Sequence, residues 1–288
     1  MRLFNNKKTI GYFFTLPWVI GFIIFTIIPI IYSIYLSFND VIITAMGIET
    51  TYIGIQNYVR VITEDMDFIR QIGNFFVETI ISVPLIVILA LIMAMLLNQN
   101  VKGRSIYRTI FFLPVIINSG PVLNKLIDLD IASIPALLQY DFYLYLLSNS
   151  DNFFINIVLF TIDNFIILLW LAGVQILIFL AALQKTDRGV NEAARIDGAS
   201  TWEIFWRITL PSLMPMILVN IIYTTVMYSM SALNQVTEHI SINMFRIDTG
   251  FGYTSALSWI YFVIILVTLG ILVFGFFLLE RKSKEGVR

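Results

Sequence analysis

The chain has 288 residues, of which 58% are hydrophobic and 13% are charged, with a formal net charge of −1. Soluble domains carry about 25% charged residues, so this composition predicts a polytopic membrane protein. The absence of cysteine excludes disulfides and thiolate metal sites, and the single histidine, His239, argues against a Ser-His-Asp triad or a histidine-based metal site. The sequence contains no Gly-x-x-x-x-Gly-Lys-Ser/Thr phosphate loop, so we do not expect ATP hydrolysis in this polypeptide.

Six segments are apolar enough and long enough to cross a membrane, which takes about 20 residues. They are residues 11–38, 72–97, 105–127, 161–183, 210–233 and 253–279. The first is too long for a signal peptide and contains Pro17 and Pro29, so we expect an uncleaved span. A polar stretch, 39–70, joins the first two spans, and an interfacial helix beginning at Phe153 could extend the fourth. We therefore predict an all-α integral membrane protein with one membrane domain over residues 1–288.

The distribution of basic residues predicts the orientation. Fourteen Lys and Arg residues lie in the N-terminus, the second–third connection, residues 184–209 and the C-terminus. The opposite connections hold four: Arg60, Arg70, Lys125 and Arg246. Because basic loops stay on the cytoplasmic side, both termini and the 184–209 loop should be cytoplasmic.

That loop continues into a segment, residues 191–215, that is unusually polar for this chain. It reads Asn-Glu-Ala-Ala-Arg-Ile-Asp-Gly-Ala-Ser-Thr-Trp-Glu-Ile-Phe-Trp-Arg-Ile-Thr-Leu-Pro-Ser-Leu-Met-Pro. We expect a helix around Glu192, a turn at Gly198 and a second short helix over 201–207. Such a helix–turn–helix suits docking into another protein, although by shape alone it could be a plain connection between spans.

Specific residues of this segment resemble a known family. Glu192-Ala193-Ala194, Asp197-Gly198-Ala199, Phe205, Ile208, Leu210-Pro211 and Pro215 are similar to the EAA loop of permease subunits in binding-protein-dependent ABC importers. The form Glu-Ala-Ala-Arg-Ile-Asp-Gly-Ala looks most like the carbohydrate-uptake (MalF/UgpA-like) permeases. Residues 108–114, 179–184 and 250–259 also resemble this family, whereas 235–249 lacks the Gly-Gly-Pro that sugar permeases often carry there.

The resemblance implies a six-transmembrane-helix ABC importer (type I) permease bundle in a bacterial or archaeal cell membrane. It also implies a second homologous permease in a heterodimer, two ABC ATPase subunits, an extracytoplasmic solute-binding protein and a sugar substrate, with no nucleic acid. ATP and Mg would bind the partner ATPases, so this chain would be non-catalytic and hold no cofactor.

In such a permease the loop docks into the ATPase. The residues that the resemblance assigns to coupling are Glu192, Ala193, Ala194, Asp197, Gly198, Ala199, Trp202 and Phe205. The acids can accept hydrogen bonds, the small residues permit close approach, and the aromatic residues offer interface anchors. Alternatively, the two acids only cap helices or form salt bridges within the loop.

A polar stripe in the fifth span is the candidate substrate path. Asn220, Thr224, Tyr228 and Ser231 fall within one quarter of the helix circumference at about 100° per residue. Amide and hydroxyl groups suit sugar hydroxyls, although the stripe could instead form hydrogen bonds between helices. Asn118 in the third span and Trp170 in the fourth are weaker candidates.

Other functions are less well supported. The acids Glu78 and Asp163 suggest a proton-coupled secondary transporter, but both lie near the external ends of their spans and no second acid is central enough to form a relay. The sequence favours carbohydrate cargo, with an oligosaccharide as the leading expectation and a glycerol-phosphate type of solute as the alternative.

Overall fold

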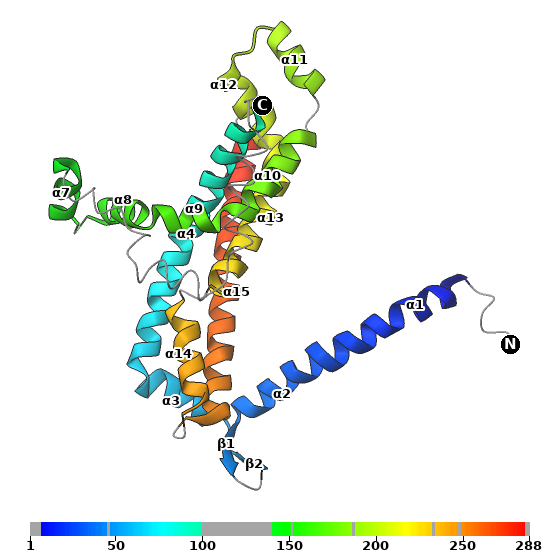
Figure 1. The fold of residues 1–288 in the computed structure, drawn as a ribbon, viewed down its shortest axis with the longest axis vertical. Coiled ribbons are helices and arrows are strands. Elements are labelled where there is room, and N and C mark those ends of the chain that lie inside the picture. The colour runs from blue at the N-terminus through cyan, green and yellow to red at the C-terminus, as the bar shows by residue number, and fades with distance from the viewer. Residues whose placement is uncertain are drawn as a thin grey trace. The chain divides into compact units, whose positions relative to one another are not determined.

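The computed structural model describes residues 7–44, 47–99, 140–150, 152–185, 188–231, 234–246 and 249–285 (Figure 1). Their contacts form two compact units, taken separately below. Unit 1 comprises Met1–Ile72 and Val236–Val263, and unit 2 comprises Gly73–Gln235 and Ile264–Arg288. We expected one membrane domain. The long helices α4 (Met66–Asn98) and α15 (Gly250–Glu285) contribute residues to both units.

Four helical segments in the described residues are long and apolar enough to cross a membrane. They are Phe14–Ser37, Met66–Asn98, Thr201–Ser229 and Gly250–Arg281. They coincide with the predicted first, second, fifth and sixth spans, so the chain is a multi-pass membrane protein. The predicted third span, 105–127, lies outside the described residues together with Asn118.

Two of these segments contain a turn of π-helix next to a proline. In the first, α1 (Lys7–Phe22) passes through η1 (Ile23–Ile27) into α2 (Ile28–Ser37), which carries Pro29. In the other, η3 (Phe205–Thr209) precedes α13 (Leu210–Ser229), which carries Pro211. A proline ring clashes with the carbonyl four residues earlier and donates no hydrogen bond. The wider π-turn accommodates that carbonyl without ending the helix.

The predicted fourth span, 161–183, is not one continuous helix. Its residues are divided among α8 (Phe153–Asp163), α9 (Phe165–Leu171) and α10 (Gly173–Lys185), and α8 and α9 meet at 68°. At the bend the Asn164 side chain donates to the Phe160 carbonyl at 2.9 Å. Asparagine competes in this way with the backbone ladder, which apolar periodicity does not reveal. A further short helix, α7 (Asp141–Ser148), packs on α8 through Tyr143, whose hydroxyl donates to Asp163 at 2.7 Å.

In unit 1, residues 39–52 form a hairpin where we expected only a polar connection. Strands β1 (Asn39–Thr44) and β2 (Gly47–Tyr52) are antiparallel, with Asn39 opposite Tyr52 and Thr44 opposite Gly47. Both strands are rich in β-branched residues, which favour this conformation. The helix α3 (Gln56–Glu64) follows.

Hydrogen bonds join the parts of unit 1. Asn57 on α3 donates to the carbonyls of Ser37 and Asn39, both at 3.0 Å, and the Tyr58 hydroxyl donates to the Ser37 hydroxyl at 2.7 Å. The Trp259 indole on α15 donates to the Ser33 hydroxyl at 3.2 Å. These bonds hold the end of α2, the start of the hairpin, α3 and α15 together.

The only histidine of the sequence belongs to a polar cluster in unit 1. Asp65 accepts hydrogen bonds from the backbone N–H of Phe68 at 3.0 Å and the hydroxyl of Tyr253 at 2.8 Å, and it lies 2.9 Å from Nε2 of His239. Burial raises the pKa of Asp65, but these bonds outweigh burial and leave the pKa below its ordinary value. The cluster joins the start of α4, the helix α14 (Gln235–Met244) and the start of α15.

The first turns of α15 lie directly against β1. A Cβ atom on Gly250 would lie 2.7 Å from the Val41 carbonyl oxygen, and one on Gly252 would overlap the Asn39 carbonyl oxygen. Only glycine permits this approach, which explains the glycines in the motif at 250–259.

Replacing Gly252 with alanine is therefore expected to destabilise the protein. Overpacking of this kind costs about 1–3 kcal/mol, because backbone atoms of β1 must move. Gly270→Ala is the matched control, since nothing lies within 4 Å of its added Cβ and alanine favours a helix. Thermal unfolding in detergent should show a lower midpoint for Gly252→Ala alone; equal midpoints would contradict the packing described here.

The core of unit 2 is apolar and lies where α4, α9, α10 and α13 meet. Buried members include Ile86, Leu168, Ile176, Phe179 and Leu213. This packing brings the middle of α13 against α10, and it fixes which side chains of the predicted polar stripe are enclosed.

Candidate coupling surface and polar seam

The segment that resembles the EAA loop forms two short helices joined by a tight turn. The helix α11 (Arg188–Ile196) is followed by a turn at Gly198, which has a φ of 86°. The N–H of Ala199 donates to the carbonyl of Ala194 at 2.9 Å, and the N–H of Gly198 donates to that of Arg195 at 3.1 Å. This pair of bonds is a Schellman motif, which requires a left-handed residue at the position of Gly198.

The next helix begins immediately after this turn. The side chain of Ser200 caps α12 (Thr201–Ile204) by accepting from the N–H of Glu203 at 3.2 Å, and the Glu203 carboxylate accepts from the N–H of Ser200 at 2.9 Å. This capping box, together with the Schellman motif, leaves few torsional degrees of freedom between α11 and α12. The segment is therefore locally rigid.

The outer surface of this segment presents large apolar side chains. Ile196 is 87% exposed and Trp202 is 69% exposed. The Trp202 ring lies 5.4 Å from the ring of Trp206 and 6.4 Å from that of Phe205, centroid to centroid. Such aromatic clusters are typical interface anchors. Sequence reasoning missed Trp206, although its spacing of four residues from Trp202 places both on one helix face.

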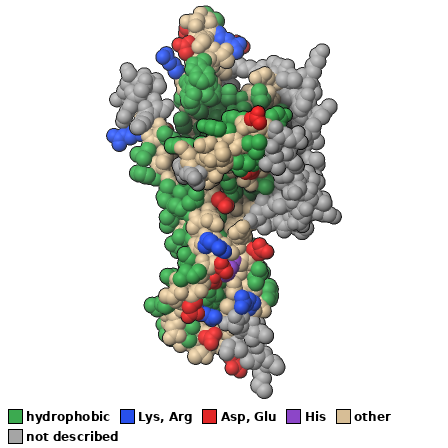
Figure 2. Space-filling view, turned by 90° about the vertical axis from the view of Figure 1, so that its left-hand side faces the viewer, with side chains coloured by type: hydrophobic (Ala, Val, Ile, Leu, Met, Phe, Trp, Pro, Cys, Tyr) green, Lys and Arg blue, Asp and Glu red, His purple; other side chains and the backbone are tan. Residues whose placement is uncertain are grey.

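Polar residues surround these apolar side chains. Glu192, Ala193, Asp197 and Gly198 are exposed, whereas Ala194, Ala199 and Phe205 are half-buried. Within the described residues, Glu192 and Asp197 form no ion pair, so the structure does not show the internal salt bridges that were the alternative. Figure 2 shows acidic and basic side chains gathered at the end of unit 2 that carries α11 and α12 in Figure 1.

The predicted stripe on α13 is partly enclosed by neighbouring helices. Thr224 is 1% exposed, and its hydroxyl accepts from the side-chain amide of Gln175 on α10 at 2.9 Å. Asn220, one turn earlier, is fully buried. In the described part of the chain neither its Nδ2 nor its Oδ1 has a hydrogen-bond partner. Leaving a buried amide without a partner costs about 1–3 kcal/mol, so Asn220 is a candidate for contact with a ligand.

The stripe continues to Tyr228 and then ends. The Tyr228 hydroxyl lies 3.5 Å from the Ser82 hydroxyl on α4, and its ring stacks on that of Phe75 at 6.4 Å. Ser231, which we placed on the same helix face, lies beyond the end of α13 at Ser229. The helix ends there because the Asn234 side chain donates to the Ser229 carbonyl at 2.9 Å.

Further polar groups lie inside unit 2. Thr79 on α4 is fully buried, and neither its hydroxyl nor the indole N–H of Trp170 has a hydrogen-bond partner among the described residues. Sequence reasoning missed Thr79 and Ser82. The sequence feature that could have identified them is a polar side chain within an otherwise apolar span. We call Thr79, Ser82, Gln175, Asn220, Thr224 and Tyr228 the polar seam.

Comparison with known proteins identifies the family. Residues 61–282 match the model of the family described as binding-protein-dependent transport system inner membrane component. A probable ABC transporter permease protein, YesP of Bacillus subtilis, is 30% identical over an alignment 308 residues long, which covers 99% of this chain and 96% of that protein.

Two relatives carry names that state their cargo. The arabinooligosaccharides transport permease AraP of Halalkalibacterium halodurans is 31% identical over 77% of this chain and 68% of its own length. The multiple sugar-binding transport permease MsmF of Streptococcus mutans is 25% identical over 90% of this chain and 92% of its own. The match over residues 61–282 and the full-length similarity confirm the predicted family: this chain belongs to the inner membrane components of binding-protein-dependent transport systems and is an ABC transporter permease.

Proposed function

We propose that this chain is the transmembrane permease subunit of an ATP-driven importer that moves a carbohydrate, specifically an oligosaccharide, into the cytoplasm. The observation that carries the proposal is Asn220, a fully buried amide without a partner in the described residues, next to the Gln175–Thr224 hydrogen bond. The names of AraP and MsmF support a sugar as the cargo.

The chemistry of the polar seam supports the same cargo. Its members are amides and hydroxyls, which both donate and accept hydrogen bonds and so match sugar hydroxyls. In lipid, polar side chains of membrane helices must face protein or a water-filled cavity. If the path is closed in one state and filled with water in another, the passing substrate would form hydrogen bonds with the Asn220 amide. The six-helix bundle remains part of the proposal, and Ser231, Trp170 and Asn118 remain further candidate path residues.

The exposed surface of α11 and α12 is the proposed docking site for the ATPase subunits. Docking would bury Trp202, Trp206 and Ile196, whose exposed apolar area supplies binding energy. Because the Schellman motif and the capping box make this segment rigid, ATPase closure would move it as a lever and shift the helices that carry the polar seam.

Family membership implies the rest of the assembly. We propose a second homologous permease forming a heterodimer, two ABC ATPase subunits that bind ATP and Mg²⁺, and an extracytoplasmic solute-binding protein. No cofactor would bind this chain. The charge asymmetry of the loops supports a cytoplasmic location for both termini, on the same side as the proposed coupling surface.

A sugar panel tests this function. The complete transporter, reconstituted in proteoliposomes with its binding protein, should show ATP-dependent uptake of one oligosaccharide and faster ATP hydrolysis when that sugar is present. If the transporter takes up only a glycerol-phosphate type of solute, that solute replaces the oligosaccharide as the proposed cargo. Solute movement by this chain alone under a proton gradient would overturn the importer assignment and turn attention to Glu78 and Asp163.

A further inference from the structure

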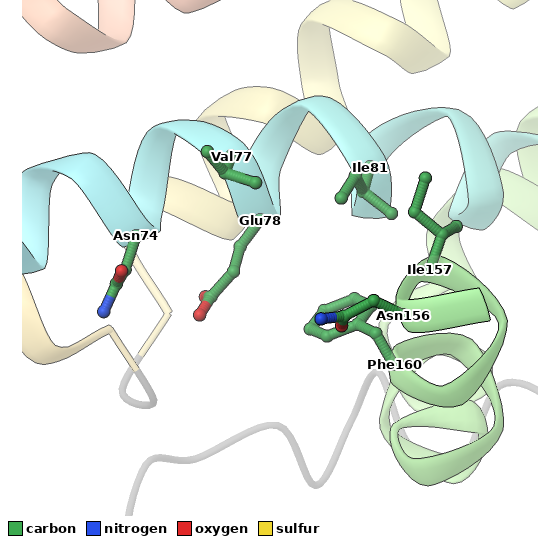
Figure 3. A pocket seen from close by; sticks show the side chains of 7 residues that line it. All are labelled: Asn74, Val77, Glu78, Ile81, Asn156, Ile157 and Phe160. Atoms are coloured by element: carbon green, nitrogen blue, oxygen red, sulfur yellow. The ribbon is translucent and has the colours of Figure 1, made fainter. Parts of the chain in front are cut away.

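Unit 2 contains a cavity separate from the polar seam. Its volume is about 320 Å³, and it lies between α4 and α8 (Figure 3). Asn74, Val77, Glu78 and Ile81 line it from α4, and Asn156, Ile157 and Phe160 line it from α8. The predicted orientation puts this end of α4 on the external side of the membrane.

Helical spacing brings the polar lining residues together. Asn74 and Glu78 are four residues apart on α4, and Asn156 and Phe160 are four apart on α8, so each pair shares a helix face. Figure 3 shows Asn74 and Glu78 on one side of the cavity and Asn156 and Phe160 on the other. The wall therefore combines one carboxylate, two amides and one aromatic ring.

The polar groups of this wall are available to a ligand. All three polar side chains belong to exposed residues, and in the described part of the chain neither side-chain amide has a hydrogen-bond partner. Glu78 interacts with the Tyr228 hydroxyl, which also approaches Ser82. Tyr228 thus links the cavity to the polar seam.

We propose that this cavity is an external entry subsite that holds one sugar ring of the cargo before it reaches Asn220 and Thr224. Sugar hydroxyls donate to the Glu78 carboxylate and exchange hydrogen bonds with the amides of Asn74 and Asn156. The C–H face of the ring packs on Phe160. Tyr228 then offers the next hydroxyl along the route inward.

The size and composition of the cavity favour a sugar over a cation. Small-molecule sites begin at about 300 Å³, which accommodates a ring rather than a bare ion. Within the described residues, no group of three or more His, Cys, Asp or Glu side chains is placed to hold a metal ion, and only one acid lines the cavity. This inference rests on the proposed carbohydrate function and adds a second site to it.

Cysteine protection tests the subsite directly, because the sequence has no native cysteine. Val77→Cys places a thiol in the cavity lining without removing a polar group. Val158→Cys is its matched control, since Val158 lies on α8 but does not line the cavity, and the two valines are 50% and 43% exposed. The complete reconstituted transporter is treated with N-ethylmaleimide, and the rate at which this chain is labelled is measured by mass spectrometry.

The transported sugar, at ten times its Kd, should slow labelling of Val77→Cys about tenfold and leave Val158→Cys unchanged, by simple mass action. If the sugar is taken up but labelling of Val77→Cys is equally fast with and without it, the subsite is overturned and the proposed function stays intact. Protection by sodium or potassium ions but not by the sugar would also overturn it. If no sugar in the panel is taken up, the proposed function fails, and the subsite fails with it.

A second variant measures the contribution of the subsite to transport. Asn156→Leu removes one hydrogen-bonding amide and should raise the KM for uptake about five- to tenfold while kcat stays the same, the size expected for one hydrogen bond. An unchanged KM would contradict direct contact between this amide and the sugar.

Discussion

Replacing Gly198 with aspartate is expected to abolish sugar uptake while the chain still inserts into the membrane. Gly198 has a φ of 86°, a left-handed conformation that costs a side-chain-bearing residue about 1–2 kcal/mol. No atom lies within 4 Å of the added Cβ, so the substitution causes no steric clash in this chain. The new carboxylate would lie beside Asp197, on the surface proposed to enter the ATPase, and at the negative end of α11.

Two controls separate the causes of this loss. Gly198→Asn has a similar shape, adopts left-handed conformations more easily than most residues and adds no charge, so it should retain part of the uptake. Gly54→Asp introduces the same residue at another positive φ, 64°, in unit 1 and should leave uptake normal. Uptake, ATP hydrolysis and co-purification of the ATPase are measured together. Normal uptake by Gly198→Asp would remove the coupling assignment.

Replacing Asn220 with leucine is expected to reduce uptake at least about tenfold without destabilising the protein, because the substrate loses a hydrogen bond in a buried site. Asn220 is fully buried, and neither polar atom of its side chain has a partner in the described residues. Removing an unsatisfied amide leaves the free energy of unfolding unchanged or raises it. The combination of a stable fold and lost transport distinguishes a path residue from a packing residue.

Thr225→Val is the matched control on the same helix. Thr225 is also fully buried, but its hydroxyl donates to the carbonyl of Ile221 in its own helix at 2.8 Å. We expect uptake by this variant to remain within about twofold of normal, since nothing assigns Thr225 to the path. Normal uptake by Asn220→Leu would show that the amide does not serve the path. A large loss of thermal stability in this variant would show that Asn220 is a packing residue.

The membrane character, the family and the helix–turn–helix around Gly198 were accessible from the sequence. Apolar runs of sufficient length predict spans directly, because a membrane helix must bury its backbone polar groups within itself. The residues around Gly198 predict a turn between two helices, because the Schellman motif and the capping box depend on near neighbours in the chain. Residues within a few positions of each other determined these features.

The partners of the polar residues depended on tertiary structure. The helical wheel placed Asn220 and Thr224 on one face. It could not show that Gln175 pairs with Thr224 while Asn220 has no partner among the described residues. It also extended the stripe to Ser231, because hydropathy alone does not reveal that Asn234 ends the helix.

The sequence by itself determined four of the apolar spans and the exposed helix–turn–helix formed by α11 and α12. Only the tertiary structure decided that α8 bends away from α9, that β1 requires Gly252 beside it, and that Asn74, Glu78 and Asn156 share one cavity. The physical reason is range: hydropathy and capping act between near neighbours, whereas cavities and buried hydrogen bonds form between residues that only packing brings together.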